Sequence, residues 1–195
     1  MRRIKIANIL IITAHPSEHN LTIGIKDIFL KEKELQGNKV EVIDLYSDKQ
    51  LPFVAYKTND DLKNLSDEVL YYQEKVTWAD EIVFVYPFWW GTTPAILKNW
   101  IDAVFTMGYA AKYGDDGRPV GLLQGKSVRI ISTSGAPTFI YCLNGIRRAN
   151  KKIWKQTIVE FCGMKFEGYH LFGGMDTKAK NVEKMFSSVK KIANK

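Results

Sequence analysis

Five short stretches of the chain are mostly apolar and rich in β-branched residues. Apolar runs of this length are typical of strands that are buried on both faces of a sheet. They cover residues 4–14, 39–45, 81–86, 127–133 and 164–172. Between them, apolar residues recur at helical spacing, which predicts helices. The predicted helices cover residues 23–35, 62–79, 95–105, 146–161 and 177–194.

Predicted strands and helices alternate along the whole chain. This order predicts a parallel sheet with helices on both faces, and the right-handed crossover rule makes it a doubly wound α/β fold. The 195 residues fit a single domain over residues 1–195. Residues 46–61 and 108–124 are predicted loops, the second a long functional loop with a tight turn at 114–117. Ligands bind beyond the carboxyl ends of strands in such sheets, so residues just after each strand carry the candidate chemistry.

The net charge of +7 raises nucleic acid, membrane surfaces and anionic ligands as partners. Lys and Arg are spread along the chain without a long basic run, so we expect no nucleic-acid partner. No apolar stretch reaches membrane-spanning length, and the N-terminal apolar run lacks a cleavage site, so we expect no membrane insertion. Cys142 and Cys162 form no CxxC pair, which favours reduced thiols in a cytoplasmic protein.

The segment AHPSEHNLTIG follows the first predicted strand and opens a helix. A polar turn at a helix N-terminus presents backbone N–H groups and hydroxyls to an anion. The candidate phosphate contacts are His15, Asn20, Leu21 and Thr22. The absence of GxGxxG and GxxxxGK[ST] argues against a dinucleotide Rossmann site and a P-loop. The alternative is a plain helix cap, in which Ser17 or Asn20 satisfies free N–H groups.

The segment YPFWWGTTPAILKNW follows the third predicted strand and places four aromatic residues at its carboxyl end. Aromatic side chains stack on flat rings and exclude water, so this loop is a candidate platform for a ring system. The four are Tyr86, Phe88, Trp89 and Trp90. The alternative is that they belong to the core or to a subunit interface. Trp100, on the following helix, is expected in the core.

The sequence resembles the flavodoxin-like NAD(P)H:quinone oxidoreductases. This family includes the mammalian quinone reductases, the bacterial modulator-of-drug-activity proteins and the ancillary subunits of potassium-efflux systems. The resemblance rests on AHP at 14–16 with the polar turn through Thr22, on YPFWWGTTPAILKNWIDAVF at 86–105, and on STSGA at 132–136 followed by Tyr141. It runs over residues 6–175, and the segment 86–105 is its most specific part.

The resemblance implies a flavodoxin-like three-layer sandwich with a five-stranded parallel sheet and a bound flavin. The flavin phosphate would lie in the first loop, at His15, Asn20, Leu21 and Thr22. The ring would rest on residues 87–91, namely Pro87, Phe88, Trp89 and Trp90. FMN is favoured over FAD because the chain has no C-terminal extension. The resemblance further implies a homodimer with the site at its interface, and ping-pong hydride transfer from NADPH or NADH to a quinone-like acceptor.

A third loop, TSGAPTFIYCLNGIRR, follows the fourth predicted strand. Backbone N–H groups of Thr133, Ser134, Gly135 and Ala136 would stabilise negative charge that develops on the ring. In the mammalian enzymes of the family a Tyr and a His assist this step, and these positions fall on Tyr141 and Arg147. Because Arg does not release protons at neutral pH, Arg147 would act electrostatically, bind a nicotinamide phosphate, or face solvent.

Two further features of the 108–124 segment have alternative interpretations. Tyr109 and Tyr113 either line the acceptor pocket of a partner subunit or lie in a mobile surface loop. Asp115 and Asp116 resemble cation ligands, but nothing nearby in the sequence supplies further ligands, so we assign no metal.

Two other functions fit the same family. A flavodoxin-type electron carrier would be acidic and would expose the flavin edge, and the +7 charge and bulky aromatic loop argue against it. A regulatory subunit of a potassium-efflux transporter would depend on a protein partner, for which the sequence contains no anchor. The sequence does not distinguish among quinones, nitroaromatics and azo dyes as acceptors.

Overall fold

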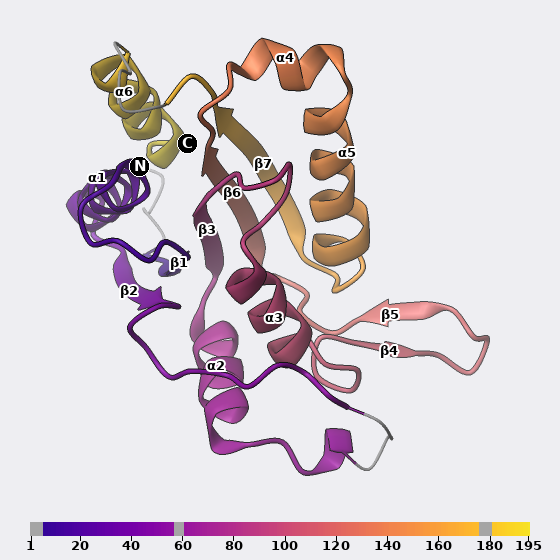
Figure 1. Cartoon of the computed structure of the whole chain (residues 1–195). Coiled ribbons are helices and arrows are strands. Elements are labelled where there is room, and N and C mark those ends of the chain that lie inside the picture. The colour runs from indigo at the N-terminus through magenta and orange to yellow at the C-terminus, as the bar shows by residue number, and fades with distance from the viewer. Residues whose placement is uncertain (1–5, 57–60, 176–180) are drawn as a thin grey trace, which may run out of the picture.

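The computed structural model of the protein describes residues 6–56, 61–175 and 181–195. Its centre is a five-stranded parallel sheet in the order β2-β1-β3-β6-β7 (Figure 1). The strands are β1 Asn8–Thr13, β2 Lys39–Asp44, β3 Glu81–Pro87, β6 Ser127–Thr133 and β7 Lys165–Phe172. The predicted α/β sandwich with a five-stranded parallel sheet is confirmed.

Helices cover both faces of the sheet, because its strands are apolar on both sides. The helices are α1 Leu21–Leu35, α2 Asp67–Trp78, α3 Ala95–Val104, α4 Thr138–Leu143, α5 Ile146–Lys152, a π-helix Ile153–Val159 and α6 Val182–Ala193. On one face, Phe29 of α1 and Val189 of α6 pack on Ile11 and Val85. On the other, side chains of α2, α3 and the π-helix pack on the alternate strand residues. None of the helices among the described residues has the length and apolar character to cross a membrane.

A buried ionic cluster lies at the amino end of the sheet. The Glu81 carboxylate accepts a hydrogen bond from Arg129 Nε at 2.9 Å and pairs with Lys33 Nζ at 3.0 Å. All three side chains are at most 10% exposed. This cluster explains why Lys33 of α1 points inward. Leu35, the last residue of the same helix, is 72% exposed.

The structure corrects the expected loop at 108–124, which contains an antiparallel hairpin. Its strands are β4 Ala111–Tyr113 and β5 Pro119–Gly121, with the expected tight turn at 114–117 between them. Three-residue strands are too short for a periodic pattern to reveal. The hairpin projects away from the body of the molecule (Figure 1).

Two predicted helices and one predicted loop also differ in detail. The helix expected at 62–79 consists of a 3₁₀ turn, Asp61–Lys63, and α2, which begins at Asp67 because Ser66 Oγ caps the Val69 N–H at 3.4 Å. The helix expected at 146–161 changes to π geometry at Ile153, which places Trp154 and Val159, five residues apart, in the core. Helix α4 occupies part of the expected third loop. Residues 177–180 of the expected last helix lie outside the described residues.

Candidate functional site

The three candidate loops meet at one edge of the sheet, because β1, β3 and β6 are neighbouring parallel strands. The rings of His15 in the first loop and Trp89 in the second lie 5.8 Å apart. The Phe88 N–H donates to the Thr133 carbonyl oxygen at 2.6 Å, and the Phe88 ring packs edge-on against Tyr141 at 5.1 Å. The second loop therefore contacts both the first loop and the segment that follows β6.

The first loop ends in the N-terminus of α1. Asn20 is the N-cap residue, and its Oδ1 accepts a hydrogen bond from the Ile23 N–H at 3.1 Å, so the helix-cap interpretation is correct for this side chain. Leu21 and Thr22 are the first two helical residues, and no hydrogen bond among the described residues uses their N–H groups. These amides, with the positive end of the helix dipole, can bind an anion. The Thr22 side chain is buried.

His15 is held in one orientation next to this helix end. Its Nδ1 accepts a hydrogen bond from the Ser17 N–H at 3.1 Å, which leaves Nε2 as the protonated nitrogen. Burial lowers the pKa of His15 below its usual 6.5, so the imidazole is neutral at pH 7. A neutral ring with a free Nε2–H can donate a hydrogen bond to an anion.

The second loop turns sharply at Trp90. Its φ of 50° makes it the only non-glycine residue with positive φ among those described, and Gly91 follows with φ 79°. The Trp89 side chain is 39% exposed and that of Trp90 is fully exposed, whereas Tyr86 and Phe88 are buried. The expected platform of four aromatic side chains is therefore reduced to two indoles, because alternate residues at the strand end turn into the core.

Buried hydrogen bonds hold Tyr86, near the end of β3, just before this turn. Trp154 Nε1–H donates to the Tyr86 hydroxyl at 2.7 Å, and Ser132 Oγ donates to the Tyr86 carbonyl oxygen at 2.8 Å. Burial raises the pKa of Tyr86 well above its usual value, so this phenol stays protonated. The π-helix and β6 thus hold the end of β3 in place.

The third loop is fixed to the end of β7. The Ser134 N–H donates to the Phe172 carbonyl oxygen at 2.9 Å, so this amide is already engaged, contrary to expectation. The N–H groups of Gly135 and Ala136 take part in no hydrogen bond within the described part of the chain. The same is true of the N–H groups of Trp90 and Gly91. Four backbone donors from two loops are thus free to bind a ligand.

Tyr141 and Arg147 lie in different surroundings. Tyr141 belongs to α4 and faces the second loop through its contact with Phe88. Arg147 belongs to α5, and its Nε is buried without a hydrogen-bond partner among the described residues. Its positive charge acts to lower the pKa of Tyr169 and His170, so Arg147 lies near β7, and the residue as a whole is partly buried.

Tyr109 and Tyr113, the two tyrosines of residues 108–124, lie in different environments. The Tyr109 hydroxyl donates to the Gln73 carbonyl oxygen at 2.6 Å and lies 2.9 Å from Thr77 Oγ. Tyr109 is thereby bound to α2 and does not belong to a mobile loop. Tyr113 lies on β4 and is 64% exposed.

Comparison with known proteins identifies the family. A family model described as a flavodoxin-like fold matches residues 7–194. The human ribosyldihydronicotinamide dehydrogenase [quinone] is 30% identical, over 80% of this chain and 77% of that protein. A ribosyldihydronicotinamide dehydrogenase-like protein, traD, of Penicillium crustosum is 34% identical, over 71% of this chain and 61% of the fungal protein.

Solved structures agree with this result. The crystal structure of Smu.1420 from Streptococcus mutans is 30% identical, covers 95% of this chain and 98% of its own, and has a TM-score of 0.77. An NAD(P)H:quinone oxidoreductase from Methanothermobacter marburgensis has the same fold, with a TM-score of 0.83 at 22% identity over 97% and 96% of the two chains. The chain therefore belongs to the flavodoxin-like fold family, together with the quinone dehydrogenases to which its sequence is related.

Proposed function

We propose that this protein is a flavin-dependent oxidoreductase that transfers hydride from NADPH or NADH to a quinone-like acceptor. The observation that carries the proposal is the meeting of the three loops through His15, Trp89, Phe88 and Tyr141. The names of its relatives support the same chemistry, since the human protein is a quinone dehydrogenase and a Bacillus anthracis neighbour is an FMN-dependent azoreductase.

The donors present at the site fit FMN, with FAD as the alternative. The free amides of Leu21 and Thr22 and the Nε2–H of His15 suit the terminal phosphate of a mononucleotide. Pro87, Phe88, Trp89 and Trp90 would hold the ring, through the exposed indoles and the free N–H groups of the turn. Asn20 would act indirectly, because its side chain caps the helix.

A bound flavin supplies the capacity to accept a hydride and pass it on. The residues of the chain would hold the flavin and its hydride donor close together and exclude water, which is the main requirement for hydride transfer. The amides of Gly135 and Ala136 would donate to the ring edge where negative charge develops, and Thr133 and Ser134 would hold that loop in place. Tyr141 would line the same edge, and Arg147 would act only through its positive charge.

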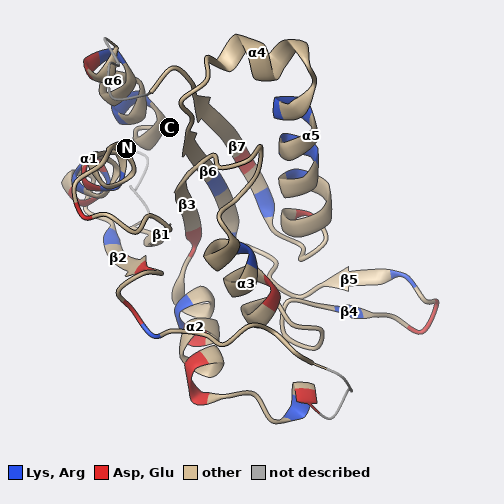
Figure 2. Cartoon of the chain, viewed as in Figure 1, with Lys and Arg blue, Asp and Glu red and all other residues tan. Residues whose placement is uncertain are grey.

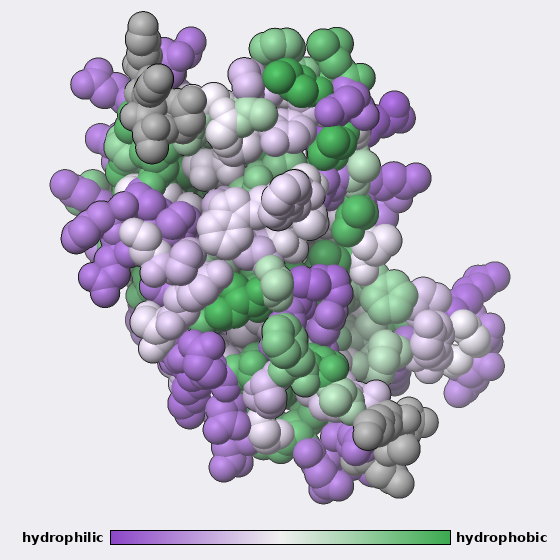
Figure 3. All heavy atoms as spheres, viewed as in Figure 1, coloured by the Kyte–Doolittle hydropathy of each residue, from purple (hydrophilic) through white to green (hydrophobic). Residues whose placement is uncertain are grey.

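The donor and acceptor would use the same pocket in turn, and a second copy of the chain would complete it. The site is open in one chain, because Trp90 is fully exposed. Beside it, α4 exposes Phe139 and Leu143 at 62% and 84%, and hydrophobic residues gather over this helix (Figure 3). Apolar patches of this kind mark protein interfaces.

Both cysteines are free, which supports a cytoplasmic location.

Purification of the protein tests the proposal directly. We expect a yellow protein that releases FMN, identified by mass, and that oxidises NADPH or NADH rapidly when a quinone is added. Initial rates at several quinone concentrations should give parallel double-reciprocal lines, as the ping-pong order requires. A protein that binds neither FMN nor FAD would refute the proposal. A yellow protein that oxidises almost no NAD(P)H without an added reductase would be an electron carrier.

A further inference from the structure

The α5 helix and the π-helix form one continuous helical segment (Figure 1), and its side chains bond to both ends of the second loop. Asn150 Nδ2 donates to the Gly91 carbonyl oxygen at 2.8 Å, where the turn of the loop ends. Trp154 Nε1 donates to the Tyr86 hydroxyl at 2.7 Å, just before the turn begins. Because Asn150 and Trp154 are four residues apart, they lie on the same side of the segment. One side of a single helical segment thus holds the chain before and after the two exposed indoles.

Both of these hydrogen bonds are shielded from water, because Asn150, Trp154 and Tyr86 are buried. A buried hydrogen bond is costly to break, since the group that remains has no water to replace its partner. The Trp154 ring also packs on Phe84 of β3, with 4.8 Å between the ring centroids. The segment therefore holds the second loop through two bonds that solvent does not replace.

The π geometry lets this row of contacts continue into the core. Ile146 precedes Asn150 by one helical turn, and a Cβ at Gly91 would lie 3.9 Å from the Ile146 side chain. After Trp154 the spacing widens from four residues to five, because the next fully buried side chain is Val159. Turns of this wider kind are rare and frequently lie at functional sites. The wider turn keeps Val159 in the core while Trp154 faces the end of β3.

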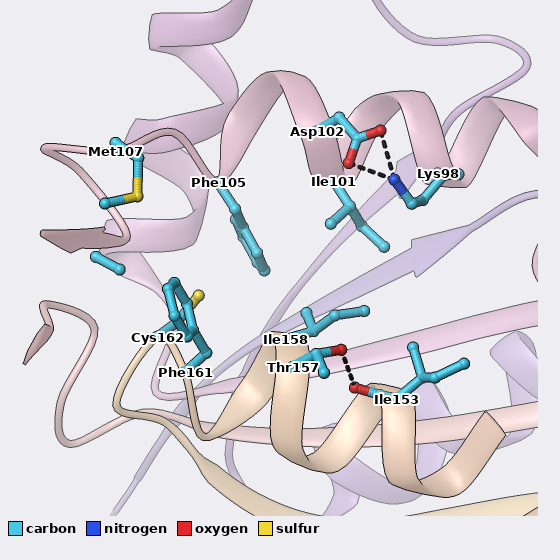
Figure 4. A pocket seen from close by; sticks show the side chains of 11 residues that line it. Lys98, Ile101, Asp102, Phe105, Met107, Ile153, Thr157, Ile158, Phe161 and Cys162 are labelled. Atoms are coloured by element: carbon cyan, nitrogen blue, oxygen red, sulfur yellow. Dashed lines mark hydrogen bonds and ion pairs between the residues drawn. The ribbon is translucent and has the colours of Figure 1, made fainter. Parts of the chain in front are cut away.

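The other sides of the segment are less firmly held. A hollow of about 360 Å³ separates Ile153 and Thr157 of the segment from Ile101 of α3 (Figure 4). Thr157 Oγ1 donates back to the Ile153 carbonyl oxygen of the same helix, at 2.7 Å. The side that bonds to Tyr86 and Gly91 therefore sets how the segment meets the loop. The outer side carries exposed cations (Figure 2), namely Arg148, Lys151 and Lys152.

We propose that Asn150 and Trp154 form a clamp that positions the second loop for ring binding, so that Trp154 acts through Tyr86 as a positioning residue of the flavin site. This inference rests on the flavin site proposed above and adds a residue too deeply buried to touch the ligand. The clamp holds the turn at Trp90, whose φ of 50° is unfavourable for a bulky residue. Without the clamp the turn relaxes, and flavin binding must then also order the loop, which lowers affinity.

A matched pair of tryptophan substitutions tests the inference. Trp154→Phe and Trp100→Phe remove the same atoms from side chains that are each 1% exposed, and Trp100 Nε1 has no hydrogen-bond partner within the described residues. Both variants lose packing, which urea denaturation measures. Trp154→Phe alone should raise the FMN dissociation constant, by about five- to tenfold, the effect of one hydrogen bond. It should also change the visible circular dichroism of FMN bound at saturation, whereas Trp100→Phe should change neither.

A double variant tests the route through Tyr86. Tyr86→Phe removes the acceptor of the bond whose donor is lost in Trp154→Phe. The double variant should bind FMN no more weakly than the weaker of the two single variants, because one interaction cannot be lost twice. Losses of affinity that multiply in the double variant would show that the two residues act independently and would overturn this route.

Amide hydrogen exchange on flavin-free protein, measured by mass spectrometry, tests the clamp without the ligand. Peptides that cover residues 87–92 should exchange faster in Trp154→Phe than in the unmodified protein or in Trp100→Phe, and residues 15–20 of the first loop should exchange alike in all three. Equal exchange at 87–92, or an equal loss of FMN affinity in the two tryptophan variants, would overturn the inference. An unmodified protein that binds no flavin would refute the proposed function instead, and the exchange at 87–92 would still decide whether the clamp holds the loop.

Discussion

The side-chain amide of Asn150 donates a 2.8 Å hydrogen bond to the carbonyl oxygen of Gly91. This bond links α5 to the turn that carries Trp90, and the same amide also donates to the Ile146 carbonyl oxygen at 3.0 Å. We expect Asn150→Ala to loosen the turn and weaken FMN binding, with a loss of about 1–3 kcal/mol in the free energy of unfolding. Flavin fluorescence titration and urea denaturation measure the two effects. Gln156→Ala, at an exposed position of the following turn, is the control and should change neither.

The two exposed indoles should contribute to flavin binding without contributing much to stability. Trp89→Ala and Trp90→Ala should each weaken FMN affinity by about three- to tenfold, the usual range for one aromatic contact. Melting temperatures should stay close to that of the unmodified protein, because neither side chain is buried. Unchanged affinity in both variants would show that the ring platform lies elsewhere. Trp78→Ala, on α2, serves as the tryptophan control for FMN affinity, which it should leave unchanged; because Trp78 packs against the core, it is not a control for stability.

The ionic cluster at the amino end of the sheet should be far more sensitive than surface pairs. Glu81→Gln leaves Arg129 and Lys33 buried without a counter-charge, so we expect a loss of about 3–5 kcal/mol in the free energy of unfolding. Glu41→Gln, which removes a partly exposed pair with Lys75, should cost only about 0–1 kcal/mol. Similar losses in the two variants, measured by urea denaturation, would contradict this view of the cluster.

His170 should make the fold sensitive to acid. Burial, together with the nearby charges of Arg129 and Lys195, lowers the pKa of His170 from 6.5 to about 4. The unfolded chain therefore binds a proton at this residue before the folded chain does, so stability is complete above pH 6.5 and falls as the pH drops towards 4. The loss is about 2–3 kcal/mol. His170→Gln should remove this part of the slope, and an unaltered slope in urea denaturation at several pH values would exclude His170 as its source.

Gly121 should tolerate no side chain. A Cβ at Gly121, the last residue of β5, would lie 2.1 Å from the Gly163 nitrogen. Gly121→Ala therefore forces the β4–β5 hairpin or the Cys162–Gly163 backbone to move, and we expect a loss of about 1–3 kcal/mol in the free energy of unfolding. At Gly135 a Cβ meets nothing within 4 Å and φ is not positive, so Gly135→Ala should keep its stability. Equal melting temperatures for both variants would show that the contact between Gly121 and the Gly163 backbone is not tight.

The fold was predictable because its signals are long and local. Every strand of the sheet appeared as an apolar run, and Trp100 was correctly placed in the core, where it is 1% exposed. The β4–β5 hairpin and α4 were missed because they are too short for periodicity to register. The π-helix was missed because a change from four- to five-residue hydrogen bonding leaves no distinct sequence pattern.

The candidate site was predictable in location but not in detail. The three loops meet as expected, since the carboxyl ends of neighbouring parallel strands share one edge of the sheet. Which aromatic side chains remain exposed depends on the turn at Trp90, and the engagement of the Ser134 amide depends on β7, which lies far along the chain. The inward position of Lys33 could not be foreseen without knowing that Glu81 lies opposite it.

The positive φ of Trp90 has a consequence for protein engineering. A bulky L-residue in this conformation costs about 1–2 kcal/mol relative to glycine. A library selected only for heat resistance should therefore replace Trp90 by Gly or Asn, whereas a library selected for turnover should retain the indole. Different residues selected at position 90 in the two libraries would show that stability and the proposed ring contact make opposite demands on this position.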